Sequence, residues 1–227
     1  MDLLNFSRGP ALTVALAVFV LGTLWRLAHA LLRPRMPDLS PPRAGAPSNL
    51  VGALRAIGRG MWPRKEFGQA ALITTLNGYV LHLGLALVFF GYAPHVAFIR
   101  RLTGLGWPTL PDGVMYLAAG ATIMALLLAL LLRLTDPVRK LISNADDLIT
   151  WALTFLPILT GMAVLSEPSA IILARDHVIY AGPLAVHLLA LELLLIWFPF
   201  GKLMHAFLFV FSRSATGMRF SHRGVEV

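Results

Sequence analysis

Four of the seven histidines of this chain fall in or beside two strongly apolar segments. His82 and His95 lie in and just after the second segment, and His187 and His205 lie in the fifth. Ionisable side chains are costly in hydrocarbon, so each of them is a candidate functional residue. A b-type haem can take one imidazole from each of two helices. The residue types therefore predict haem iron bound by two pairs, His82/His205 and His95/His187.

The spacing along the fifth segment supports this pairing. Eighteen residues separate His187 from His205, which on a continuous helix is five full turns and about 27 Å, close to the thickness of the hydrocarbon core. We therefore expect both imidazoles on one face of one helix, with one near each membrane surface. The second segment runs in the opposite direction, which places His82 at the depth of His205 and His95 at the depth of His187.

The composition indicates a chain that lies mainly in lipid. The 227 residues are 57% hydrophobic and 13% charged, with a mean hydropathy of +0.74, whereas water-soluble domains carry about 25% charged residues. The chain has no Cys. This excludes disulfides, thiolate metal sites, Cys-ligated iron–sulfur clusters and thiol catalysis within the chain itself.

Five windows are long and apolar enough to cross a bilayer, which takes about 20 residues. Backbone groups in hydrocarbon must be satisfied within each segment, and the windows lack the alternation of barrel strands. We therefore predict an all-α bundle of five membrane helices, in one membrane domain over residues 1–227 with a linker at 33–69. The first window is expected to be retained, because its apolar run is too long for a signal peptide. The windows are about 10–32, 70–92, 113–134, 148–165 and 181–211.

Lys and Arg are distributed unevenly over the connections between these windows. Thirteen lie in the first long connection, the third connection and the tail, against four on the other side. The positive-inside rule then places the N-terminus outside and the C-terminus in the cytoplasm. The pI near 10.8 is explained by this topology, and we expect no nucleic-acid partner.

Residues 49–61 of the linker predict a short amphipathic helix. Their apolar residues recur at helical spacing, with Arg55 and Arg59 on the opposite face. This pattern is typical of a helix lying on the inner membrane surface. A helix packed on the bundle fits the pattern equally well.

Other polar residues in the windows have two interpretations each. Arg26 and Lys202 near the inner ends could pair with haem propionates or reach the lipid headgroups. Glu192 could be an interhelical hydrogen-bond partner or a quinone-linked proton carrier. His29 could replace one of the four ligands above.

The outer side carries the candidate quinone residues. Arg100 and Arg101 follow His95, and His177 lies in the last outer connection. A quinone headgroup needs hydrogen-bond partners and a proton exit to water. We expect quinone chemistry near these residues.

Several stretches resemble the respiratory nitrate reductase gamma subunit family. In the fifth window they are Val186–Leu188 and Trp197–His205, and in the second window Val80–Gly84 and Phe89–Tyr92. Five helices, an outside N-terminus and a cytoplasmic tail also match, so the resemblance covers nearly the whole chain. The first window, Gly9–Arg26, looks more like the membrane cytochromes of sulfur-metabolising complexes, such as the one accompanying dissimilatory sulfite reductase.

One position departs from the family pattern. The family's second ligand on this helix aligns with Tyr92, and His95 lies three residues further on, after Pro94. On a straight helix His82 and His95 would be about 140° apart, so a distortion near Gly91 is required for both to face one partner. The inner pair is the firmer expectation. If Tyr92 marks a lost site, one haem remains.

The resemblance implies a haem b subunit of a respiratory complex in the bacterial cytoplasmic membrane. Such a subunit passes electrons between membrane quinone or quinol and a cytoplasmic iron–sulfur subunit, and it acts as an oxidoreductase only within its complex. A heterodisulfide-reductase-like partner is favoured over the beta subunit of a nitrate reductase. A proton-coupled transporter and a passive membrane anchor without haem are the alternatives.

Overall fold

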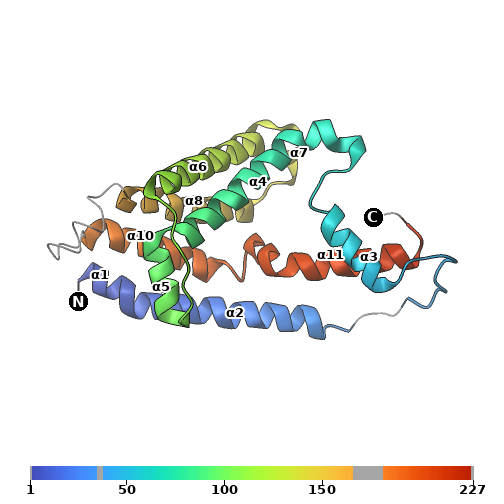
Figure 1. Cartoon of the computed structure of the whole chain (residues 1–227), viewed down its shortest axis with the longest axis horizontal. Helices are drawn as coiled ribbons and strands as arrows, with labels where there is room; N and C mark the ends of the chain where they lie inside the picture. Colours follow the sequence, from blue (N-terminus) through green and yellow to red (C-terminus); the bar gives the residue numbers. More distant parts are fainter. Residues whose placement is uncertain (1, 35–37, 166–180, 226–227) are drawn as a thin grey trace. The chain divides into compact units, whose positions relative to one another are not determined.

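The computed structural model describes residues 2–34, 38–165 and 181–225, and every regular element in these ranges is a helix (Figure 1). The all-α class is therefore confirmed for these residues. The chain divides into two compact units. Unit 1 comprises Met1–Phe19 and Leu76–Trp197, and unit 2 comprises Val20–Thr75 and Phe198–Val227. Each unit is described by itself.

Four helices are long and apolar enough to cross a membrane, and a fifth span results if two consecutive C-terminal helices are counted together. The bounds of these four helices agree with the first four predicted windows to within a few residues. The exception is the first helix, which begins well before its window. The described chain thus has the helices of a multi-pass membrane protein. The four are Leu3–Leu32, Lys65–Gly91, Asp112–Thr135 and Ala145–Val164.

The first membrane helix begins earlier than predicted. It consists of α1 (Leu3–Phe6), a π-helical turn (Ser7–Ala11) and α2 (Leu12–Leu32). The Asp2 carboxylate accepts a hydrogen bond from the Asn5 backbone N–H at 2.7 Å and caps the start. Pro10 lies in the π-helical turn, where the wider turn accommodates a residue that has no N–H.

Unit 1 contains most of the apolar helices, which are joined by polar contacts near their ends. The Arg133 guanidinium forms a 3.0 Å ion pair with the buried Asp147 carboxylate, linking α6 to α8. The Trp151 indole N–H donates to the Leu126 carbonyl at 2.8 Å. The helices of this unit are α4 (Gly68–Gly91, from Leu76 onward), α5 (Ala93–Thr103), α6 (Asp112–Thr135), α7 (Pro137–Ile142), α8 (Ala145–Leu165) and α10 (Ala181–Trp197).

A glycine allows a close local approach between α4 and α6 in unit 1. A side chain at Gly84 of α4 would collide with the Thr122 hydroxyl of α6. The Thr122 side chain is buried and donates to the Ala118 carbonyl at 2.7 Å. Glycine at position 84 is therefore what lets these two apolar helices approach.

Unit 2 contains α3 (Asn49–Arg59) and α11 (His205–His222), which lie side by side (Figure 1). The predicted short helix at 49–61 is confirmed. It packs on α11 through Gly52 and Ala56, which meet Gly217 and Ser221. The choice between a helix on the membrane surface and a helix packed on the bundle stays a prediction.

The fifth window is not one helix, contrary to the prediction. The α10 helix ends at Trp197, and helical structure resumes with a 3₁₀ turn at Lys202–Met204 before α11. The intervening residues 198–201 include Pro199, which has no N–H to donate. Counting five full turns from His187 to His205 is therefore wrong, and a shared helix face does not follow.

Candidate cofactor site

His95 is positioned by a break at the end of α4. This helix ends at Gly91, Tyr92 is extended with φ −75° and ψ 129°, and Pro94 lies in the first turn of α5. Beyond the break, the His95 Nδ1–H donates to the Val88 carbonyl at 3.0 Å. The distortion predicted at this point is confirmed.

His187 is positioned by α8, which packs beside α10. The Thr160 hydroxyl donates its single proton to the Leu156 carbonyl at 2.7 Å, so at 3.2 Å it accepts from the His187 Nδ1–H. A Cβ at Gly161 would lie 3.2 Å from the imidazole Cε1. Glycine there lets the backbone of α8 lie against the ring.

The imidazoles of His95 and His187 face each other within unit 1. Their ring centroids are 6.2 Å apart and their planes differ by 16°. A metal–imidazole nitrogen bond is about 2 Å long and that nitrogen lies about 1.1 Å from its ring centroid, so two imidazoles sharing one metal ion have centroids about 6 Å apart. The observed centroid separation is close to this value, and the direction of each Nε2 toward a shared iron stays a prediction.

Both rings have the tautomer that iron ligation needs. Since Nδ1–H is the donor in each case, the neutral ring carries its lone pair on Nε2. Burial lowers the pKa of His95 from its ordinary value, which keeps this ring neutral at pH 7. No cluster of three or more His, Asp or Glu side chains suited to a metal occurs in the described part of the chain. Two imidazoles suffice for haem, because the macrocycle supplies the other four nitrogens.

His82 and His205 have the same tautomer. The His82 Nδ1–H donates to the Gly78 carbonyl at 2.7 Å, and the His205 Nδ1–H donates to the Lys202 carbonyl at 2.8 Å. His82 belongs to unit 1 and His205 to unit 2. Their pairing therefore stays a prediction.

The residues expected near haem propionates both lie in unit 2. Arg26 is half-buried on α2, and Lys202 is exposed at the start of the 3₁₀ turn. His29 is one turn after Trp25, and their ring centroids are 6.2 Å apart. Their roles toward a haem stay predictions.

Two of the three expected quinone residues share a helix with His95. Arg100 and Arg101 occupy the last turn of α5, and His95 lies in its first turn. The Arg100 side chain packs against Gly106. A Cβ added at Gly106 would lie 3.0 Å from Arg100 Cδ. His177 lies outside the described residues. Quinone binding here stays a prediction.

Glu192 is buried in α10, with 3% of its surface exposed. The predicted interhelical hydrogen bond is not found among the described residues, because neither carboxyl oxygen of Glu192 has a partner there.

Sequence reasoning missed a polar cluster in unit 2. The Asp38 carboxylate accepts hydrogen bonds from Ser40, and it forms a 3.1 Å ion pair with Arg223. The Ser40 hydroxyl and backbone N–H, with the Arg223 guanidinium, hold the pKa of Asp38 at about 2. The His222 Nε2 donates to the Ser40 carbonyl at 2.8 Å. His222 and Arg223 lie more than 180 residues from Ser40 and Asp38 in sequence, so no local pattern could reveal these long-range contacts.

No model of a known protein family matches the chain. A protein of the bacterium Nitratidesulfovibrio vulgaris, strain Hildenborough, is 28% identical over 228 aligned positions, which cover 95% of this chain and 92% of the relative. The name of that relative, "Protein", specifies no activity. The two chains are similar over nearly their whole lengths.

Proposed function

We propose that this chain is the haem b-binding membrane subunit of a bacterial respiratory complex, passing electrons between membrane quinone or quinol and a cytoplasmic iron–sulfur subunit. The observation that carries the proposal is the pair of facing imidazoles of His95 and His187 at 6.2 Å. The matching tautomers and the resemblance of the histidine-bearing windows to the nitrate reductase gamma subunit family support it.

In this proposal the protein binds and orients the cofactor through two helices of unit 1. His95 on α5 and His187 on α10 would hold the iron through Nε2. The Val88 carbonyl and the Thr160 hydroxyl fix the ring orientations through Nδ1. A bound haem supplies reversible one-electron chemistry. The second pair, His82 and His205, would hold a second haem.

In this proposal electrons enter and leave the protein on opposite sides of the membrane. Arg100 and Arg101 on α5, with His177, are the candidate groups for a quinone headgroup. Because the chain has no Cys, any iron–sulfur cluster must belong to a partner subunit. The arginines of the linker and of α11 would attract an acidic face of that partner. The resemblance of the first window favours a complex of sulfur metabolism.

The test is optical spectroscopy of the protein purified from its native membrane. We expect a haem b α-band on reduction, and reduction by added quinol as well as by dithionite. Replacing both arginines, Arg100→Ala with Arg101→Ala, should slow reduction by quinol and leave reduction by dithionite unchanged. Arg8→Ala, an exposed arginine of unit 1, is the matched control. A protein purified intact without haem would overturn the proposal.

A further inference from the structure

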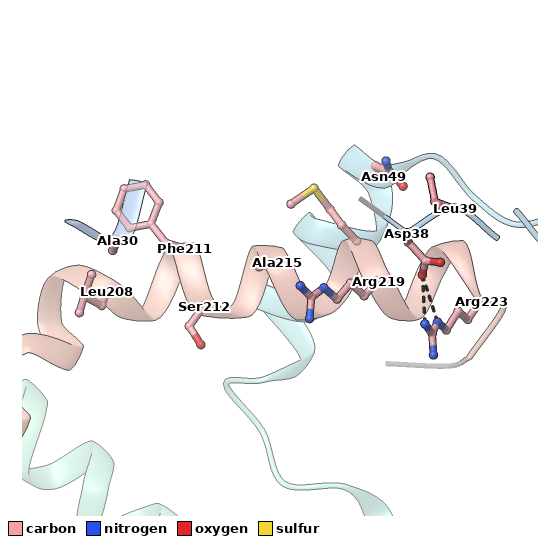
Figure 2. A pocket seen from close by; sticks show the side chains of 11 residues that line it. Ala30, Asp38, Leu39, Asn49, Leu208, Phe211, Ser212, Ala215, Arg219 and Arg223 are labelled. Atoms are coloured by element: carbon pink, nitrogen blue, oxygen red, sulfur yellow. Dashed lines mark hydrogen bonds and ion pairs between the residues drawn. The ribbon is translucent and has the colours of Figure 1, made fainter. Parts of the chain in front are cut away.

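Unit 2 contains a groove of about 920 Å³ along one face of α11 (Figure 2). Its walls come from α11, the end of α2, the linker and the first residue of α3. Every residue that lines it belongs to unit 2. They are Ala30, Asp38, Leu39, Asn49, Leu208, Phe211, Ser212, Ala215, Met218, Arg219 and Arg223.

The groove changes from apolar to cationic along α11. Leu208, Phe211 and Ala215 line it at helical spacing, and Arg219 and Arg223 follow toward the C-terminus (Figure 2). Leu208 and Phe211 fall inside the fifth apolar window, which ends at residue 211. Arg219 and Arg223 lie beyond it. The groove therefore has an apolar end and a cationic end, as a phospholipid has apolar chains and a charged headgroup.

One of the two arginines in the groove is already neutralised. Arg223 is paired with Asp38, the only carboxylate among the lining residues (Figure 2). Arg219 forms no ion pair with any residue that the structure describes. The Asn49 amide and the Ser212 hydroxyl add hydrogen-bonding groups to the lining. The groove thus offers one unneutralised cation at the end of an apolar channel.

We propose that this groove binds an anionic phospholipid of the leaflet at the C-terminal side, with its phosphate at Arg219 and an acyl chain along Leu208 and Phe211. Eleven residues of helix separate Leu208 from Arg219, a rise of about 16 Å. One acyl chain spans about half of the roughly 30 Å hydrocarbon core, so it is long enough to extend from Arg219 to Leu208. A soluble anion or an acidic peptide would not contact the apolar part of the groove at Leu208 and Phe211.

The experiment is native mass spectrometry of the full chain titrated with phosphatidylglycerol or phosphatidylcholine in detergent. Arg219→Ala should weaken phosphatidylglycerol binding about fivefold, the effect of one cation near a membrane surface, with phosphatidylcholine binding unchanged. Arg64→Ala removes the same charge from an exposed position outside the groove. This variant should bind both phospholipids as the unaltered protein does. Glycerol phosphate, which has the headgroup chemistry without the chains, should not compete.

A second variant tests the apolar part. Ala215→Trp would fill the groove and should reduce binding of both lipids, with the helix content by circular dichroism confirming that the chain still folds. Equal effects of Arg219→Ala and Arg64→Ala would overturn the proposal, since they would indicate general charge attraction. Effective competition by glycerol phosphate would also overturn it in favour of a soluble anion. Neither result depends on whether haem is bound.

Discussion

The hydrogen bonds at Nδ1 decide what each histidine of the candidate site can do. In His95 and His187 this nitrogen is occupied by the Val88 carbonyl and the Thr160 hydroxyl. Each ring is held in one orientation with Nε2 as its basic nitrogen. Partners of this kind raise ligand basicity and align the ring for a metal. Thr160 and Gly161 are therefore part of the site, although neither can bind iron itself.

Removing the Thr160 hydroxyl should weaken haem binding while leaving both histidines in place. We expect Thr160→Val to lower haem affinity about tenfold, the lower end of the effect of losing such a partner, measured by haem transfer to apomyoglobin. Thr154→Val is the matched control, because among the described residues the Thr154 hydroxyl bonds only the Thr150 carbonyl of its own helix. Equal losses in the two variants would contradict a positioning role for Thr160.

The Asp38 carboxyl should titrate near pH 2, below its ordinary value of 3.8. Since the folded pKa is the lower one, the Asp38 contacts stabilise unit 2 fully above about pH 4 and are lost as the pH falls through about 2. The measurement is carboxyl ¹³C NMR of Asp38. Ser40→Ala should raise this pKa most and Arg223→Ala should also raise it, whereas Arg64→Ala should not. A midpoint near 3.8 in the unaltered protein would contradict the observed contacts.

Among the elements, α3 and α11 depend on close backbone approach. A side chain at Gly217 would collide with the Gly52 carbonyl and with Ala56 Cβ. The same face of α3 is free of large side chains, while its Leu50 and Leu54 are exposed. The helix pair is therefore held by the fit of small residues rather than by burial of leucines.

Enlarging that contact should separate the two helices. We expect Gly217→Val to destabilise the packing of α3 by about 1–3 kcal/mol, the usual cost of overpacking, seen as faster amide hydrogen exchange in α3. Gly58→Ala is the control, because nothing lies within 4 Å of its Cβ position, and alanine favours the helix over glycine. Unchanged amide hydrogen exchange of α3 in Gly217→Val would contradict the claim that close backbone approach at Gly217 holds α3 on α11.

Hydropathy predicted the first four membrane helices because bilayer thickness fixes their length. Hydropathy alone did not indicate the break at residues 198–201, since Phe198 and Phe200 keep the stretch apolar, but Pro199 was a local signal that could have indicated it. The break after Gly91 was predictable, because Pro94 has no N–H for the Phe90 carbonyl four residues earlier and its ring interrupts a continuing helix. The contacts of Thr160 with His187 and of Ser40 with His222 could not be predicted, because each joins residues that are distant in sequence.

For the whole molecule, the distribution of Lys and Arg predicts the topology. A reporter fused after Val227 should report cytoplasm, and one inserted near Pro111 should report the outer side. The physical reason is that cationic connections are retained on the cytoplasmic side during insertion. Reversed signals would overturn the side assignments of the quinone residues and of the iron–sulfur partner.

The central claim is that His95 and His187 bind one haem iron. Electron paramagnetic resonance of the oxidised protein tests it most directly, because losing one of two imidazole ligands converts low-spin to high-spin iron. The account predicts that His95→Ala and His187→Ala each remove the same low-spin signal and leave any signal of His82 and His205 unchanged. Retention of every low-spin signal in His187→Ala would contradict the account.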